Sequence, residues 1–106
     1  MPTPDPQQLH QLLNDIEAEL QQLELWTSAP PPASAFDSTM PFFADRMAFE
    51  QWLQWVFIAR FRALLDGARA LPDQCNVAPM AEEALKPHAG KTAVLIALLE
   101  KFDQQF

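Results

Sequence analysis

The side chains that could act as nucleophiles or metal ligands are few and widely spaced in this chain of 106 residues. The single cysteine is Cys75, and the two histidines are His10 and His88. Metal sites need clustered ligands, typically with C-x-x-C or H-x-x-x-H spacing, and the sequence has neither. A Cys75–His88 pair would form a nucleophile if the fold joined the two, but a lone thiol in a helical domain more commonly packs as a small apolar residue. We therefore expect no metal, no cofactor and no catalytic residue, and an enzymatic role is the less favoured one.

Residues 89–92 read AGKT, which is similar to the end of a phosphate-binding loop. Such a loop requires a glycine five residues before Gly90 and a strand in front of it. Position 85 is Leu85, and the segment before it has a helical pattern. Nucleotide binding is therefore not expected here.

Acidic residues dominate the first part of the chain, which has a net charge of −7. Residues 1–45 contain seven acidic residues and no lysine or arginine, whereas residues 46–106 contain seven of each sign. Such a charge distribution repels nucleic-acid phosphates and anionic membranes and attracts basic surfaces. We expect no direct nucleic-acid or membrane binding. The simpler explanation for the excess of acidic residues is solubility alone. The functional explanation is that the acidic surface binds a basic protein partner.

The N-terminal residues MPTPDPQQLH lack the basic and apolar regions of a signal peptide. The longest apolar stretch, residues 52–61, is interrupted by Gln54 and Arg60 and is shorter than the roughly 20 residues of a membrane span. The length suits one domain over residues 1–106. We expect a cytoplasmic protein.

Four segments have the periodicity of helices, so the predicted fold is an all-α compact bundle of about four helices. The first runs from Pro6 to about Trp26 after an Asp5 cap. A long Pro-rich connecting loop, residues 27–43, follows. The second helix begins near Asp45 and is apolar on two sides, as expected of a central helix. The third is capped by Asn76, and the fourth begins around residues 90–92.

Arg60 is unusual because helical counting places it in the middle of the apolar face that contains Phe49 and Trp52. A charge there must pair with a carboxylate or extend to water. A structural ion pair is one interpretation. The other is an anchor for an anion or an acidic peptide beside Trp52 and Trp55, since Arg and Trp dominate binding hot spots.

The segments PFFADRMAFEQWLQWVFIARF, residues 41–61, and LPDQCNVAPMAEEAL, residues 71–85, resemble the YqcC-like family of small bacterial proteins. The resemblance covers nearly the whole chain and implies an all-α domain of unknown function. Members are often encoded beside a tRNA pseudouridine synthase, which implies an association and not a chemistry. The motif positions, our candidate interaction or pocket residues together with Arg60, are Phe42, Asp45, Phe49, Gln51, Trp52, Gln54, Trp55, Pro79, Met80 and Glu82.

Two functional interpretations remain. The first is a non-enzymatic protein-interaction module, whose partner would be an unidentified protein such as an RNA-modification enzyme, or a second copy in a homodimer. Gln51, Gln54 and Trp55 lie off the main apolar face, and an exposed tryptophan flanked by amides is typical of a recognition patch. The second is a small apolar ligand-binding domain with a pocket lined by Phe42, Phe49, Trp52 and Met80.

Overall fold

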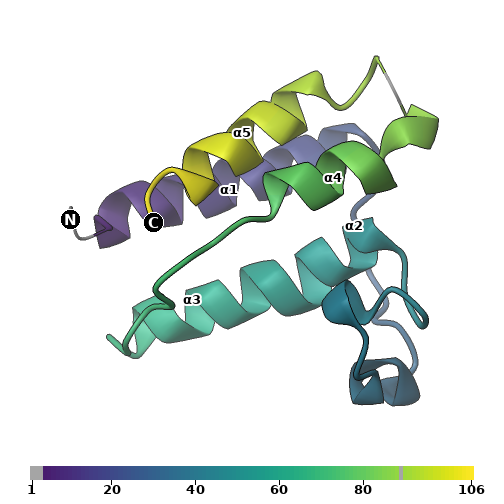
Figure 1. Ribbon diagram of the computed structural model, residues 1–106, viewed down its shortest axis with the longest axis horizontal. Helices are drawn as coiled ribbons and strands as arrows, with labels where there is room; N and C mark the ends of the chain where they lie inside the picture. Colours follow the sequence, from purple (N-terminus) through teal and green to yellow (C-terminus); the bar gives the residue numbers. More distant parts are fainter. Residues whose placement is uncertain (1–3, 89) are drawn as a thin grey trace.

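The computed structural model describes residues 4–88 and 90–106, whose regular secondary structure is entirely helical, without a β-strand in those ranges. The elements are α1 (Pro6–Gln22), the 3-10 helices η1 (Ala33–Asp37) and η2 (Pro41–Phe43), α2 (Phe49–Trp52), the π-helical η3 (Leu53–Ile58), α3 (Ala59–Asp66), α4 (Ala78–Ala84), the 3-10 helix η4 (Lys86–His88) and α5 (Ala93–Asp103). Because α2, η3 and α3 follow without a break, the described residues form four main helices (Figure 1). The predicted all-α class is confirmed.

The core lies where α1, α5 and α4 pack over the long helix α2–η3–α3 (Figure 1). α1 lies beside α5 and also contacts α3, and α4 packs on α5. Across the described residues, none of the helices combines the length and hydropathy that crossing a bilayer requires. The largest fully buried side chains are Leu9, Leu13, Ile16, Leu20, Leu53, Ile58, Leu85, Leu95, Leu99 and Phe102.

The first helix is capped as predicted but ends four residues early. The Asp5 side chain accepts a hydrogen bond from the backbone N–H of Gln7 at 3.0 Å. At the other end Glu24 adopts a left-handed conformation with φ of 61°, and the N–H of Leu25 donates to the carbonyl of Leu20 at 2.9 Å. This Schellman turn closes the helix, and it lets Leu25 and Trp26 pack against the core instead of continuing the spiral.

The second helix begins at Phe49 and not near Asp45. Phe42 and Phe43 both have left-handed backbones, with φ of 57° and 52°, which forces a turn before the helix. The backbone N–H of Met47 then donates to the carbonyl of Phe43 at 3.0 Å. The Asp45 side chain accepts from the Ser38 hydroxyl, so it stabilises the connecting segment and does not cap a helix.

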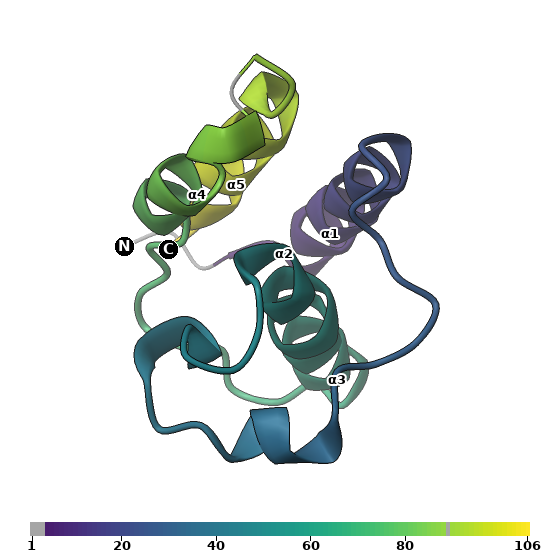
Figure 2. The same cartoon turned by 90° about the vertical axis from the view of Figure 1, so that its right-hand side faces the viewer.

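The connecting segment, expected over residues 27–43, extends from residue 23 to residue 48 and contains η1 and η2. Figure 2 shows this segment passing around the side of the long helix that faces away from α1, α4 and α5. Pro31 and Ala35 are buried, and Ala35, Met47 and Val56 form a second, small core there. The segment is therefore anchored to the long helix at Ala35 and Met47, while most of its other residues are exposed.

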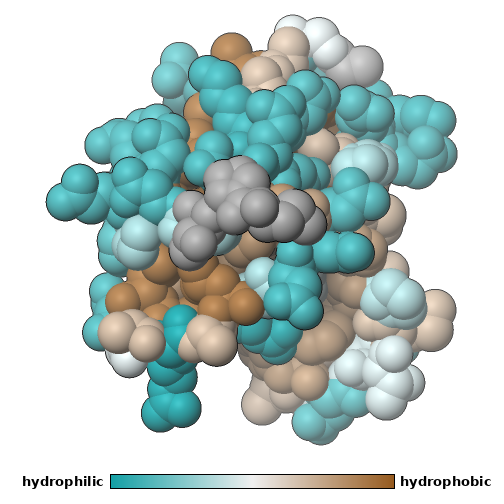
Figure 3. Space-filling model, turned by 60° about the vertical axis from the view of Figure 1, so that its left-hand side comes forward, coloured by the Kyte–Doolittle hydropathy of each residue, from teal (hydrophilic) through white to brown (hydrophobic). Residues whose placement is uncertain are grey.

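Apolar residues reach the surface in several places. On the face of the molecule shown in Figure 3, hydrophilic residues cover most of the upper part and apolar residues appear below them. Among residues 4–88 and 90–106, the large apolar side chains with the greatest exposure are Val94 at 57%, Met40 at 50% and Phe36 at 38%. Two of these three, Met40 and Phe36, belong to the connecting segment. The surface that this segment forms with the long helix is therefore partly apolar.

Candidate interaction surface

Cys75 has a partner that disfavours nucleophilic chemistry. Its thiol is partly buried and lies beside the carboxylate of Asp103. The pKa of the Cys75 thiol is raised far above its ordinary value of 9.0, mainly by burial and secondly by the Asp103 carboxylate. A thiol must ionise to attack, so this environment opposes the reaction that a pair with His88 would need. Within residues 4–88 and 90–106, no group of three His, Cys, Asp or Glu side chains is arranged to hold a metal ion.

Asp103 also holds the start of α4, a role that the sequence assigned to Asn76. Its carboxylate accepts hydrogen bonds from the backbone N–H groups of Val77, at 2.9 and 3.0 Å to its two oxygens, and of Ala78 at 2.8 Å. The prediction of an Asn76 cap was wrong because the acceptor comes from α5, 26 residues away from Val77. No local pattern in the sequence identifies such a partner.

Two motif residues, Gln54 and Trp55, clamp the chain where it leaves α1. The Gln54 amide accepts from the Thr27 N–H at 2.9 Å and donates to the Thr27 carbonyl at 2.6 Å. The Trp55 indole N–H donates to the Thr27 hydroxyl at 3.1 Å. Gln54 is only 6% exposed, so its expected place in an exposed patch was wrong. The Gln54 amide supplies the two hydrogen bonds that the backbone of Thr27, which lies outside any helix, would otherwise lack.

Gln51 and Asp45 have local structural contacts. The Gln51 side chain accepts from the N–H of Ala48 at 3.0 Å, which satisfies a free donor in front of α2. Asp45 is exposed and pairs loosely with Arg46 at 3.7 Å besides its bond to Ser38. The two residues shape the entry into the long helix and lie near its start.

Phe42, Phe49 and Trp52 form a small aromatic cluster at the edge of the core. The ring centroids are 4.8 Å apart for Phe42–Trp52 and 5.7 Å apart for Phe49–Trp52. Trp52 is half-buried and not fully buried as its helical position suggested. Beside the cluster lies an apolar crevice of about 200 Å³, lined by Phe42, Ala44, Met47, Ala48, Phe49, Met80 and Ala84.

Pro79 and Glu82 lie apart from the aromatic cluster. Both are exposed on α4 and line a shallow acidic depression with Glu100 and Asp103. Met80, between them, is the motif residue of α4 that faces the crevice. The candidate residues of the sequence therefore divide between a structural clamp, an apolar crevice and the α4–α5 surface.

Arg60 is exposed, which corrects its expected place in the apolar face. The physical reason is η3, because a π-helical turn inserts one residue and rotates everything after it by about 100° relative to a regular helix. Phe61 takes the inward position and is 6% exposed. The ion pair of the long helix belongs instead to Arg62, whose Nη1 lies 2.7 Å from Glu17 Oε1 of α1.

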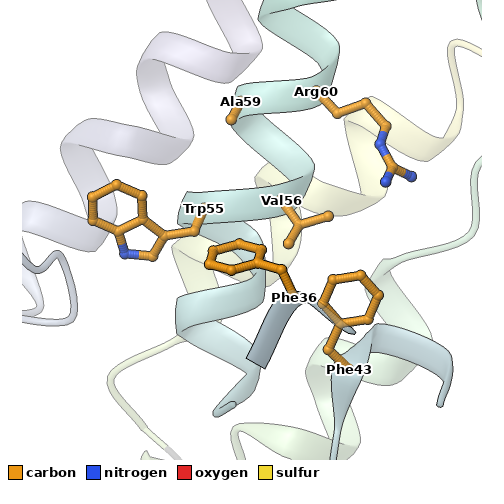
Figure 4. A pocket seen from close by; sticks show the side chains of 6 residues that line it. All are labelled: Phe36, Phe43, Trp55, Val56, Ala59 and Arg60. Atoms are coloured by element: carbon orange, nitrogen blue, oxygen red, sulfur yellow. The ribbon is translucent and has the colours of Figure 1, made fainter. Parts of the chain in front are cut away.

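Arg60 and Trp55 lie on the same open groove as the exposed aromatic groups of the connecting segment. The groove has a volume of about 450 Å³ and is lined by Phe36, Phe43, Trp55, Val56, Ala59 and Arg60. Figure 4 shows Trp55 on one side, the Phe36 and Phe43 rings next to Val56, and the Arg60 guanidinium on the side of Phe43. Phe36 and Phe43 were not among the residues predicted for a functional site. The sequence predicted that Phe36, Met40, Phe42 and Phe43 would pin the Pro-rich segment by burial, whereas Phe36 is 38% and Met40 50% exposed.

Comparison with known proteins gives close matches over most of the chain. A family model described as tRNA pseudouridine synthase C matches residues 8–105. The uncharacterised protein YqcC of Escherichia coli is 42% identical over 94 residues, which cover 89% of this chain and 86% of YqcC. The solution NMR structure of E. coli YqcC matches with a TM-score of 0.83 at 38% identity, covering 94% of this chain and 86% of that one.

One further relative is a much longer protein. A protein of Pectobacterium carotovorum named tRNA pseudouridine synthase C is 51% identical over 65 residues. The match covers 61% of this chain but 17% of that protein.

Proposed function

Because this chain belongs to the YqcC-like family of small bacterial proteins, we propose that it is a non-enzymatic interaction module that binds a tRNA pseudouridine synthase. The chain would act in the same process as the enzyme without performing its chemistry. Its contribution would be a folded surface that the enzyme recognises.

The observation that carries this proposal is the long Pectobacterium relative. A segment similar to 65 residues of this chain occupies 17% of a protein named tRNA pseudouridine synthase C. Two parts of one polypeptide meet at a high effective concentration, so a weak contact between them suffices. Where the same parts occur as separate chains, binding must replace the covalent link. The family description points to the same enzyme.

The charge of the chain supports such a partner. An enzyme that binds tRNA needs a positive surface to neutralise phosphates. The acidic residues of the first 45 positions, with no lysine or arginine among them, would attract that surface and speed the encounter. The complex would therefore weaken as the salt concentration rises.

The direct test is binding between the purified full chain and the tRNA pseudouridine synthase C of the same organism. We expect isothermal titration calorimetry to give a dissociation constant in the micromolar range or tighter, that is, a free energy of about −8 kcal/mol or below. A pseudouridine synthase of another class is the matched control and should show no heat of binding. No complex at about 100 μM of both proteins would contradict the proposal.

A second candidate function is favoured by the apolar crevice at Phe42, Phe49 and Met80. Its volume of about 200 Å³ is below the roughly 300–1,000 Å³ of ordinary ligand sites, so it would take a small apolar group. Native mass spectrometry of the protein purified from cells should then reveal a bound small molecule that Met80→Trp, which fills the crevice, excludes. A ligand-free mass in the wild type would leave the interaction module as the sole proposal.

A further inference from the structure

The groove between the connecting segment and the long helix has an exposed apolar floor and one cationic side. Its rings come from η1, η2 and η3, while Ala59 and Arg60 come from the start of α3. Phe36 is 38% exposed, and the Phe43 and Trp55 side chains are half-buried. An open groove of this kind suits an extended peptide segment better than a small molecule, because small-molecule sites enclose most of the surface of their ligand.

The walls of the groove are fixed in advance. Phe42 and Phe43 are consecutive residues with left-handed backbones, a conformation that bulky side chains rarely adopt. This backbone sends Phe42 to the apolar crevice and Phe43 to the groove. The Nη1 of Arg46 donates to the Ser34 carbonyl at 3.1 Å and holds η1 in place. A partner would therefore lose little free energy in ordering this surface.

Arg60 has no salt bridge within the described part of the chain, and its side chain is exposed at the edge of the groove. A guanidinium binds carboxylates through paired hydrogen bonds and stays charged at every physiological pH. The geometry points to the groove as the docking site for a partner segment in which an aspartate or glutamate side chain neighbours a large apolar side chain. This inference rests on the proposed function, and it names the surface and the kind of segment by which the synthase would be bound.

A second copy of this chain is a poor occupant of the groove. In a two-fold symmetric dimer the same patch lies on both sides of the contact. An arrangement that brings the two Arg60 side chains together places like charges in contact, and one that separates them offers neither arginine a carboxylate from the residues that line the groove. Like charges without counter-charges disfavour such a contact. A carboxylate supplied by a different protein removes this difficulty.

The first experiment tests the groove without the synthase. A phage-displayed library of random linear peptides is selected on the full chain, and an enriched peptide is synthesised and titrated calorimetrically. We expect enriched sequences that combine Asp or Glu with a large apolar residue. Arg60→Glu and Phe36→Ala should each weaken binding at least about tenfold, whereas Arg60→Lys, which keeps the charge but loses the planar fork, should weaken it less.

Two matched controls accompany these variants. Arg69→Glu reverses an exposed arginine outside the groove, and Val94→Ala truncates an exposed apolar side chain on α5. Both should bind the peptide as the wild type does. Trp55 is not used as the test residue because its hydrogen bond to Thr27 contributes to the fold. Absence of enriched peptides, or peptides whose binding ignores Arg60 and Phe36, would overturn the groove as a docking site.

The second experiment repeats the titration with the synthase and the same variants. We expect Arg60→Glu and Phe36→Ala to bind the synthase about tenfold more weakly than the wild type. The two controls should bind it as the wild type does. If the wild type binds the synthase and all variants bind equally well, the groove proposal is wrong and the proposed function stands. If the wild type binds peptides through the groove but not the synthase, the partner in the proposed function is wrong. Sedimentation of the wild type as a dimer that Phe36→Ala dissociates would identify a second copy as the occupant instead.

Discussion

At the scale of single residues, the contacts of Trp55 change how its family motif is understood. The indole ring lines the groove, while the indole N–H bonds to the Thr27 hydroxyl. One side chain therefore serves both the fold and the exposed surface. The sequence left two roles open for Trp55, association at the surface or packing in the core. Neither includes the bond to Thr27, since nothing in the spacing of residues relates position 55 to position 27.

Trp55→Phe should lower the free energy of unfolding by about 0.5–1.5 kcal/mol, because it removes one partly buried hydrogen bond and keeps most of the ring. Urea unfolding measures this loss. Thr27→Val should produce at least as large a loss, because the Thr27 hydroxyl also lies 3.2 Å from the Ala29 carbonyl oxygen and 3.3 Å from Gln54 Oε1. The double variant should be less destabilised than the sum of the two single variants. Thr27→Ser keeps the hydroxyl and is the control. A Trp55→Phe protein as stable as the wild type would mean that the bond contributes nothing.

The Cys75 thiol should behave as an inert group with a pH-dependent effect on stability. Its pKa is raised in the folded state by burial and by Asp103, so above about pH 9 the unfolded chain loses the thiol proton while the folded chain keeps it. The unfolded state is then favoured, and stability falls as pH rises. The unfolding free energy of the wild type should decline more steeply between pH 8.5 and 10, roughly the range in which a free cysteine ionises, than that of Cys75→Ala.

Alkylation provides an independent measurement on the same thiol. Iodoacetamide at pH 8 should modify Cys75 in the folded protein far more slowly than in the urea-unfolded protein, because the reagent attacks the thiolate. Equal rates in the two states would show that neither burial nor Asp103 protects the thiol. Such a result would mean that Cys75 can act as a nucleophile in the folded protein.

At the scale of elements, the ends of the helices were the least accessible to sequence reasoning. α3 ends at Asp66 and Gly67 is its C-cap, but the left-handed residue of its Schellman turn is the next one, Ala68, with φ of 50°. The N–H of Arg69 donates to the carbonyl of Leu64 at 2.9 Å and closes the turn. Gly67 therefore stands one residue before the position where the conformational freedom of a glycine would matter most.

Ala68→Gly should therefore stabilise the protein by up to about 1 kcal/mol, because glycine adopts a left-handed backbone without the steric cost of a Cβ atom. The melting midpoint should rise by a few degrees. Gly67→Ala is the matched control: it introduces a Cβ only 3.3 Å from the Ala63 carbonyl oxygen and should give no gain. A lower melting midpoint for Ala68→Gly would show that chain entropy outweighs the relief of strain here.

The π-helical segment η3 has the largest effect of any element on the surface. By inserting one residue between Trp52 and Ala59 it turns Arg60 outward and Phe61 inward. Without it, regular helical counting would bury a charge beside Phe49 and Trp52. The same shift brings Arg62 to Glu17 of α1. The groove and the interhelical ion pair both depend on this single irregular turn.

At the scale of the whole molecule, the acidic excess gives a prediction about nucleic acids. The chain should not bind duplex DNA more tightly than about 100 μM at physiological salt, because its net charge of −7 repels phosphates. Fluorescence anisotropy with a labelled duplex measures this. The tRNA pseudouridine synthase, if it is the partner, should bind tRNA in the same assay and serves as the positive control. Submicromolar DNA binding that weakens with rising salt would contradict the prediction.

The motifs of the sequence indicated the family by resemblance. The sequence by itself also determined the all-α class and the apolar seam of α1, in which Leu9, Leu13, Ile16 and Leu20 are buried, while the fifth residue of the predicted seam, Leu23, is half-buried against the core. These properties follow from local periodicity and from residues close together in the chain, which the spacing of side chains encodes directly. The Asp5 cap is equally local, since donor and acceptor are two residues apart.

Only the tertiary structure decided which motif residues face solvent and which hold the fold together. Gln54 is buried because Thr27 needs both of its hydrogen bonds, Asp103 starts α4 from another helix, and Arg60 is exposed because η3 rotates α3. Each of these depends on partners about 25 or more residues away or on a break in helical regularity. A residue's type and spacing limit the contacts it can make, but the packing of distant segments chooses among them.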